Sequence, residues 1–220
     1  MPPRAQARAK AQSAAPPPRP ELSREFVAVH KRRRIMDAIA ELTAEQGYDA
    51  TKIGDIVSRA GVARKTLYDN FEGKEEVFLA AFDATIEEVL ERIEADCGEV
   101  EGGWEERVQA GLAAFLRYMA ENPARARMCM IEALSATQAA TERYEAAMQR
   151  FVELTRRTVP QDDRLPATID ETLVGGVAWI VYQQIRREET EKAADLLPEL
   201  SEFMLAPFHG AAEADRRANA

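Results

Sequence analysis

Histidine and cysteine, from which most metal sites and nucleophilic active sites are built, are scarce in this sequence. The 220 residues include only two of each, His30, His209, Cys97 and Cys129. The histidines lie near opposite ends of the chain, which disfavours both a zinc site and a Ser/His/Asp triad. Two isolated cysteines suit a reducing compartment better than a disulfide framework. We therefore expect no metal, no cofactor and no enzymatic activity, with both histidines as ordinary surface residues.

Long hydrophobic runs are also missing. The longest, from Leu173 to Tyr182, has ten residues and contains two glycines. A membrane-spanning helix needs about 18 or more apolar residues. The N-terminus lacks the apolar middle region of a secretory signal. These absences predict a protein with no membrane partner and, by elimination, a cytoplasmic location.

The acidic net charge of −9 is unevenly distributed. Residues 1–74 contain 14 Lys/Arg and 9 Asp/Glu, whereas residues 75–220 contain 15 Lys/Arg and 29 Asp/Glu. A basic N-terminal region followed by an acidic remainder suggests that only the N-terminal region contacts a polyanion.

Alternating strand patterns are absent, and Gly, Pro and Asn recur between helical periods. The pattern predicts an all-α fold of about nine helices. Residues 1–23 hold six of the eleven prolines and are expected to be a disordered basic tail. We expect a DNA-binding unit over 24–74, an effector-binding and dimerisation unit over 75–210, and a flexible tail over 211–220.

The first predicted helix runs from about Phe26 to Gln46, with Ile35, Ile39 and Leu42 on one stripe and Gly47 as the residue that ends it. Two short helices follow, over about 51–60 and 63–71, and then a long helix from Lys74. Further helices are expected over about 104–121, 124–135, 141–158, 167–190 and 195–208.

The two short helices, joined by Gly61, have the form of a helix-turn-helix. At 100° per residue, Leu67 and Phe71 point inward, and the opposite face is centred on Lys65 and Asp69. Lysine and arginine can donate to guanine, threonine can meet a base edge, and aspartate can accept from cytosine. This pattern predicts that the second helix enters the major groove of DNA.

Other residues of this region are candidates for phosphate contacts. Thr51 is expected to cap the first short helix and offer its hydroxyl to the DNA backbone. Lys74 opens the following helix and is expected to clamp the backbone from the far side. The full set of predicted DNA contacts is Arg33, Arg34, Thr51, Lys52, Arg64, Lys65, Thr66, Tyr68, Asn70 and Lys74.

Residues 35–83 resemble the DNA-binding domain of the TetR/AcrR family of bacterial transcriptional regulators. The resemblance rests on Ala38, on "GYDATKIGDIVSRAGV" and on "TLYDNFEGKEEVF". It covers under a quarter of the chain. Asn70 stands where histidine or tyrosine is common, and Gly54 is a less usual choice on its helix. The resemblance implies a homodimer that binds a near-palindromic operator at the nucleoid. It also implies DNA contacts by Thr51, Arg64, Lys65, Thr66, Tyr68 and Lys74.

Two helices near the C-terminus carry more apolar surface than one core stripe requires. We interpret the excess as an intersubunit four-helix bundle; the alternative is two wholly buried core helices. The predicted dimer residues are Leu173, Val177, Ile180, Val181, Leu200, Phe203 and Met204.

Aromatic and methionine side chains on the C-terminal helices are candidates for a ligand pocket. Such stripes also occur as ordinary core. The candidates are Trp104, Phe115, Tyr118, Met119, Met128, Met130, Trp179 and Tyr182.

The sequence therefore predicts a dimeric, sequence-specific DNA-binding regulator, interpreted as a repressor released from its operator by a small apolar or aromatic ligand. The alternative is a DNA-binding regulator or architectural factor with no small-molecule effector. A C-terminal region without a cavity would favour that alternative. An enzyme is disfavoured by the poverty of histidine and the lack of a recognisable nucleophile.

Overall fold

The computed structural model describes residues 24–218, with side-chain surroundings for residues 27–209, and is all-α over that range. The helices are α1 (Arg24–Gln46), α2 (Ile53–Ala60), α3 (Arg64–Tyr68), α4 (Lys74–Glu99), α5 (Trp104–Glu121), α6 (Pro123–Met130), α7 (Gln138–Thr158), α8 (Ile169–Arg186) and α9 (Leu197–Ala218). Two 3-10 helices, η1 (Glu132–Leu134) and η2 (Thr190–Leu196), lie between them.

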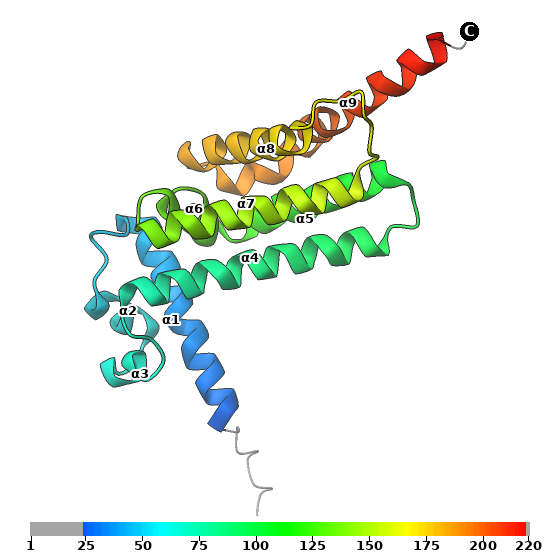
Figure 1. The fold of residues 1–220 in the computed structure, drawn as a ribbon. Coiled ribbons are helices and arrows are strands. Elements are labelled where there is room, and N and C mark those ends of the chain that lie inside the picture. The colour runs from blue at the N-terminus through cyan, green and yellow to red at the C-terminus, as the bar shows by residue number, and fades with distance from the viewer. Residues whose placement is uncertain (1–23, 219–220) are drawn as a thin grey trace, which may run out of the picture.

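The helices form an elongated molecule with the helix-turn-helix at one end (Figure 1). Helices α2 and α3 lie beside α1 and the start of α4. Helix α4 runs along the molecule beneath α5 and α7, and α8 and α9 form the opposite layer. Helix α6 lies at the end nearest α1, so it is the part of the upper layers that meets the DNA-binding unit.

The stripes predicted for α1 and α4 are confirmed as core. Ile35 and Ile39 are 0% exposed, and Phe78 and Phe82 from α4 pack into the same cluster. Gly47 ends α1 with φ of 82°, a left-handed conformation that favours glycine. The hydrophobic face of α1 therefore fixes the base of the helix-turn-helix.

Several predicted boundaries differ from the structure. Helix α2 begins at Ile53, α3 has only five residues, and the helix expected over 124–135 divides into α6 and η1. The flexible tail predicted for 211–220 is wrong for residues 211–218, because α9 continues to Ala218. The tail predicted for residues 1–23 lies outside the described residues.

Candidate DNA-binding surface and internal cavity

The turn between α2 and α3 depends on Gly61. Its φ of 60° is left-handed, and a Cβ there would lie 2.5 Å from Nη2 of Arg34. The same guanidinium donates to the Gly61 carbonyl at 3.3 Å. Behind α3, Leu67 is 0% and Phe71 is 2% exposed, so the predicted inward face is confirmed. The outward face of α3 is therefore fixed by the core.

Two arginines that the sequence reasoning missed hold the helix-turn-helix on α1. The guanidinium of Arg32 lies 4.2 Å from the centre of the Phe71 ring and donates to the Asn70 carbonyl at 3.1 Å. Arg59 of α2 pairs with Glu41 at 3.0 Å and Glu45 at 2.7 Å. The Arg59 ion pairs are exposed to solvent, so their main effect is on orientation and not on stability. No local pattern reveals these contacts, because the partners lie far apart in sequence.

The outer face of α3 presents cations and one aromatic ring. Arg64, Lys65 and Asp69 are exposed, and Tyr68 is 48% exposed. Nη2 of Arg64 donates to the Tyr68 hydroxyl at 3.4 Å, so these two side chains form one unit. Thr66 is half-buried on the same helix. This surface has the donors needed to read base edges in a major groove.

The predicted DNA-contact residues outside the exposed face of α3 differ in how accessible their side chains are. Lys52 is exposed at the start of α2, and the Arg33 side chain is 64% exposed. Arg34 lies against Gly61 as described, and Asn70 donates through Nδ2 to the Thr66 carbonyl at 2.7 Å. Lys52 and Arg33 are therefore exposed predicted cations outside α3, and Nε of Arg33 lies 4.0 Å from Oδ2 of Asp37.

The structure corrects the prediction that Thr51 caps the first short helix. The structure makes Lys52 the N-cap of α2, with the Lys52 N–H donating to Oδ2 of Asp55 at 3.0 Å. Thr51 is 1% exposed, and its hydroxyl donates to the Gly47 carbonyl at 2.8 Å. The hydroxyl is thus used inside the protein, where it stabilises the loop after α1.

Lys74 is also turned toward the protein. Its Nζ donates to the Tyr48 carbonyl at 2.9 Å and lies 3.9 Å from the centre of the Tyr48 ring. A charged hydrogen bond and a cation–π contact together outweigh what a solvated lysine would gain by staying free. In this conformation Lys74 joins the start of α4 to the loop after α1.

We therefore expect Lys74→Met to act on stability more than on DNA binding. Loss of the two contacts should lower the free energy of unfolding by about 1–3 kcal/mol. Urea unfolding measures this change, with the exposed Lys31→Met as the control. The opposite result would be an unchanged free energy of unfolding together with a slope of log affinity against log salt that falls by about one. That result would make Lys74 a phosphate contact.

A cavity of about 120 Å³ lies among α4, α5, α7 and α8, and Met130 of α6 and Met204 of α9 also line it. Its apolar wall includes Ile93, Val108, Phe115, Met130, Phe151 and Val177, and its polar groups come from Cys97, Arg107, Thr155 and Thr158. Burial raises the pKa of the Cys97 thiol. An apolar wall with a few polar groups is typical of a small-molecule site.

Most of the residues predicted for a ligand pocket do not line this cavity. From the predicted set, only Phe115 and Met130 line this cavity. Tyr118, Met119 and Met128 are packed core, at 0%, 2% and 0% exposed. Trp104 packs edge-to-face on Phe208, with ring centres 5.3 Å apart. Trp179 is 57% exposed and stacks on Tyr182 at 5.5 Å.

The predicted dimer residues divide into two groups. Five of them are at most 8% exposed and pack inside the subunit, so they are unavailable to a partner: Leu173, Val177, Val181, Leu200 and Met204. The other two, Ile180 and Phe203, are 36% and 41% exposed. Phe203 packs on Gly176, where a Cβ would lie 2.7 Å from the ring. With Trp179, they form the outer apolar face, defined as Trp179, Ile180 and Phe203.

Within residues 24–218, no helix is long and apolar enough to cross a membrane. The same part of the chain contains no group of three or more His, Cys, Asp or Glu side chains arranged to hold a metal ion.

The comparisons with known proteins agree with this geometry. A family model described as bacterial regulatory proteins of the tetR family matches residues 35–81. The uncharacterized HTH-type transcriptional regulator YezE of Bacillus subtilis is 33% identical over 44% of this chain and 49% of its own length. The HTH-type transcriptional repressor KstR of Rhodococcus jostii is 28% identical over 80% of this chain and 82% of its own.

The fold is also similar to that of a solved regulator. The structure of the transcriptional regulator FadR from Bacillus subtilis, in complex with stearoyl-CoA, superposes with a TM-score of 0.70 and 18% identity. The match covers 78% of this chain and 96% of that one. The chain thus spans about half the length of YezE but nearly all of the FadR fold.

Proposed function

Because the chain belongs to the TetR family of bacterial transcriptional regulators, we propose that it is a homodimeric repressor released from a near-palindromic operator by a small apolar or aromatic ligand. Residues 24–74 form the helix-turn-helix domain, and residues 75–210 form the effector domain, which holds the ligand and the dimer contacts. The outer apolar face joins two copies, so that two α3 helices meet successive major grooves roughly 34–36 Å apart.

The single observation that carries the DNA-binding half of the proposal is the geometry of α3. Leu67 and Phe71 bury its inner side, and Lys65 is exposed on the other side. The helix itself lies at one end of the molecule (Figure 1). Lys65, Thr66 and the Arg64–Tyr68 pair then face base edges and phosphates together. Lys52 and Arg33 add backbone contacts on either side.

The cavity sets the scale of the ligand. An engineered cavity of about 150 Å³ holds benzene, so 120 Å³ suits one ring or a short aliphatic chain. The FadR structure contains stearoyl-CoA, which suggests acyl groups as a second class to test. A long acyl chain requires this cavity to enlarge, and we therefore place the smaller ligands first.

Ligand binding acts on DNA affinity only through a difference in affinity for two conformations. We propose that a ligand between α4 and α7 tilts α4, whose first residue adjoins the helix-turn-helix. The tilt changes the spacing of the two α3 helices. A coupling of about 1–3 kcal/mol is typical of such switches.

Selection of bound genomic fragments by the purified protein tests this proposal. We expect a near-palindromic site to be enriched, and gel shifts on that site to weaken with monocyclic aromatic or short-chain ligands. Failure to enrich any sequence would contradict the proposed function. Enrichment with no response across aromatic ligands, fatty acids and acyl-CoA would favour a regulator without a small-molecule effector.

Cys97 provides a direct test of where the ligand binds. Its half-buried thiol lines the cavity, whereas Cys129 is buried and its pKa is raised to about 12. We expect a thiol reagent to modify Cys97 alone, at a rate that rises with pH because the thiolate is the reactive form. A ligand that weakens operator binding should slow this reaction in proportion to its occupancy. Cys97→Ser is the control, and an unprotected Cys97 would place the ligand elsewhere.

A further inference from the structure

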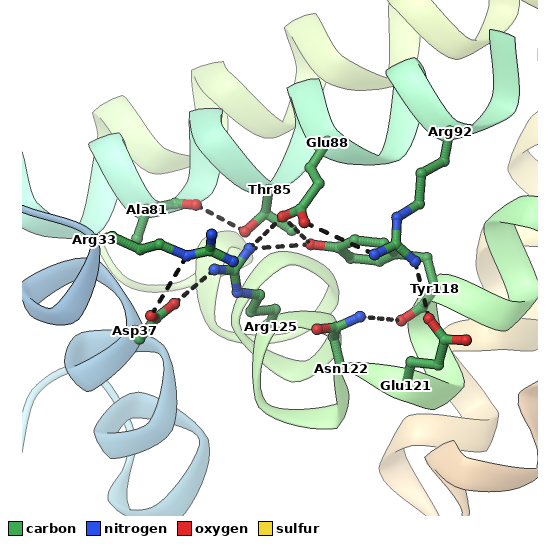
Figure 2. A network of polar contacts seen from close by, with 10 residues as sticks. All are labelled: Arg33, Asp37, Ala81, Thr85, Glu88, Arg92, Tyr118, Glu121, Asn122 and Arg125. Atoms are coloured by element: carbon green, nitrogen blue, oxygen red, sulfur yellow. Dashed lines mark hydrogen bonds and ion pairs between the residues drawn. The ribbon is translucent and has the colours of Figure 1, made fainter. Parts of the chain in front are cut away.

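One short segment of the effector domain holds the helix-turn-helix domain through two charged side chains. We call residues 123–134, which comprise α6 and η1, the anchor segment. Its first charged group is Arg125, whose side chain is only 17% exposed. Nη2 of Arg125 donates to Oδ1 of Asp37 on α1 at 2.6 Å (Figure 2). Arg125 is therefore a direct bridge into the DNA-binding unit.

The other side of the same guanidinium faces the effector domain. Nη1 of Arg125 lies 2.6 Å from Oε2 of Glu88 on α4 and 3.2 Å from the Tyr118 hydroxyl on α5. That hydroxyl also donates to Glu88 at 3.1 Å. Figure 2 shows Arg125 between these groups and Asp37. One planar side chain thus fixes α1 relative to both α4 and α5, which a lysine cannot do with a single donor centre.

The second charged group is Glu132, at 9% exposed. Its Oε2 accepts from the Tyr48 N–H at 3.1 Å. Tyr48 follows Gly47 in the loop that leads into α2, and its carbonyl accepts from Lys74. Glu132 therefore holds the loop that positions the helix-turn-helix, at a point separate from the Arg125 contact.

Met130 lies between the two contacts in sequence and forms part of the cavity wall. It is 7% exposed, and Ala126, Met128 and Cys129 of the same segment are also buried. A short, tightly packed helix moves as a unit rather than by bending. A group that displaces Met130 from the cavity side therefore displaces Arg125 on the same helix, and it pulls on Glu132, which begins η1 two residues further along the chain.

We infer that Arg125 and Glu132 are positioning residues that set the angle of the helix-turn-helix domain, and that Met130 transmits cavity occupancy to them. The inference rests on the proposed function for its ligand, but the positioning role does not require one. Its consequence is specific: loss of the Arg125 geometry should change the angle even when the charge is retained.

The first experiment measures that angle within one subunit. Spin labels at Ser58 on α2 and Gln149 on α7, both exposed, report the distance between the two domains. The background carries Cys97→Ser, and labelled protein is diluted with unlabelled protein so that only distances within one chain are seen. We expect Arg125→Lys and Glu132→Met, which removes the acceptor for the Tyr48 N–H, each to shift or broaden the distance distribution.

Arg150→Lys is the matched control. Arg150 on α7 binds Glu87 on α4 at 2.6 Å, next in sequence to Glu88, but joins two helices of the effector domain only. It should leave the distance unchanged. An unchanged distribution in Arg125→Lys and Glu132→Met would overturn the inference. This readout decides the positioning role even if the protein selects no DNA, so it is independent of the proposed function.

The second experiment tests transmission without a ligand. Ala178 lines the cavity from α8, so Ala178→Phe fills it with a ring, and Ala178→Ser is the control that does not. We expect Ala178→Phe to shift the same distance distribution and to weaken binding to the selected DNA by roughly 5- to 150-fold. In the Arg125→Lys, Glu132→Met background, Ala178→Phe should add little further change.

Full additivity of Ala178→Phe with the anchor variants would show that occupancy acts by another route. If Ala178→Phe fails to fold, Ala178→Leu makes the same comparison with a smaller side chain. Lysine at position 125 is preferred to alanine because it retains a charge opposite Asp37 and Glu88. A collapse of folding caused by uncompensated carboxylates is thereby avoided.

Discussion

Replacing Trp179 by glutamate is expected to convert the proposed homodimer into folded monomers and to abolish tight operator binding. Trp179 is 57% exposed and lies beside Ile180 on the outer apolar face, so its loss leaves no hole in the core. A tryptophan has about 150–250 Å² to bury, but Trp179 is already partly covered within its subunit. Burial of the exposed part at an interface is therefore worth about 2–4 kcal/mol at about 25 cal/mol/Å². Two symmetric copies and the new charges make the loss larger still.

The measurement is the molar mass of the variant in solution, followed by titration of an operator with two half-sites. Val29→Glu is the matched control, because Val29 is also an exposed apolar residue, at 66%, but lies on α1. It should remain dimeric. A Trp179→Glu protein that keeps the dimer mass would move the subunit contact away from the outer apolar face.

The dimer prediction also shows where sequence reasoning fails. Helix α8 is apolar on more than one side, and Leu173, Val177 and Val181 recur every four residues on one stripe. That stripe is buried within the subunit, whereas Trp179 and Ile180 lie on the other. A helical pattern identifies two apolar stripes but not which of them meets its own chain. Packing against α7, and to a smaller extent against η2, α6 and α9, makes that choice.

Helices with one apolar stripe were predicted correctly for the same reason. In α1 and α4 the remaining faces are polar, so only one orientation buries Ile35 and Ile39 or Phe78 and Phe82. The wall of the cavity follows no such rule, because it collects single residues from several helices. Large residues such as Tyr118 and Met128 are packed in the core, and the cavity lies elsewhere.

Polar contacts between residues far apart in the chain could not be predicted from the sequence either. Lys74 follows Tyr48 by 26 positions, and Arg125 follows Asp37 by 88. A lysine that opens a helix next to a DNA-binding surface looks like a phosphate contact until its partner is seen. The exposed cations of α3 escape this difficulty, because Leu67 and Phe71 fix the direction of Lys65 from within the helix.

Lys65→Ala is accordingly expected to reduce affinity for the selected operator while leaving binding to unrelated DNA nearly unchanged. Lys65 is exposed at the centre of the outward face of α3, where it can donate to guanine in the major groove. A base contact of this kind contributes about 1–3 kcal/mol of discrimination, and the loss should be confined to one position of each half-site.

Lys52→Ala is the comparison that separates recognition of base edges from neutralisation of phosphate charge. Lys52 is exposed at the start of α2, where a phosphate contact is expected. Its loss should weaken all sequences alike and lower the slope of log affinity against log salt by about one. Titrations of both variants on operator and random DNA at several salt concentrations provide the measurement. If Lys65→Ala shows the same uniform loss and the same change of slope, Lys65 binds a phosphate, and sequence must be read by Thr66 or by the Arg64–Tyr68 pair.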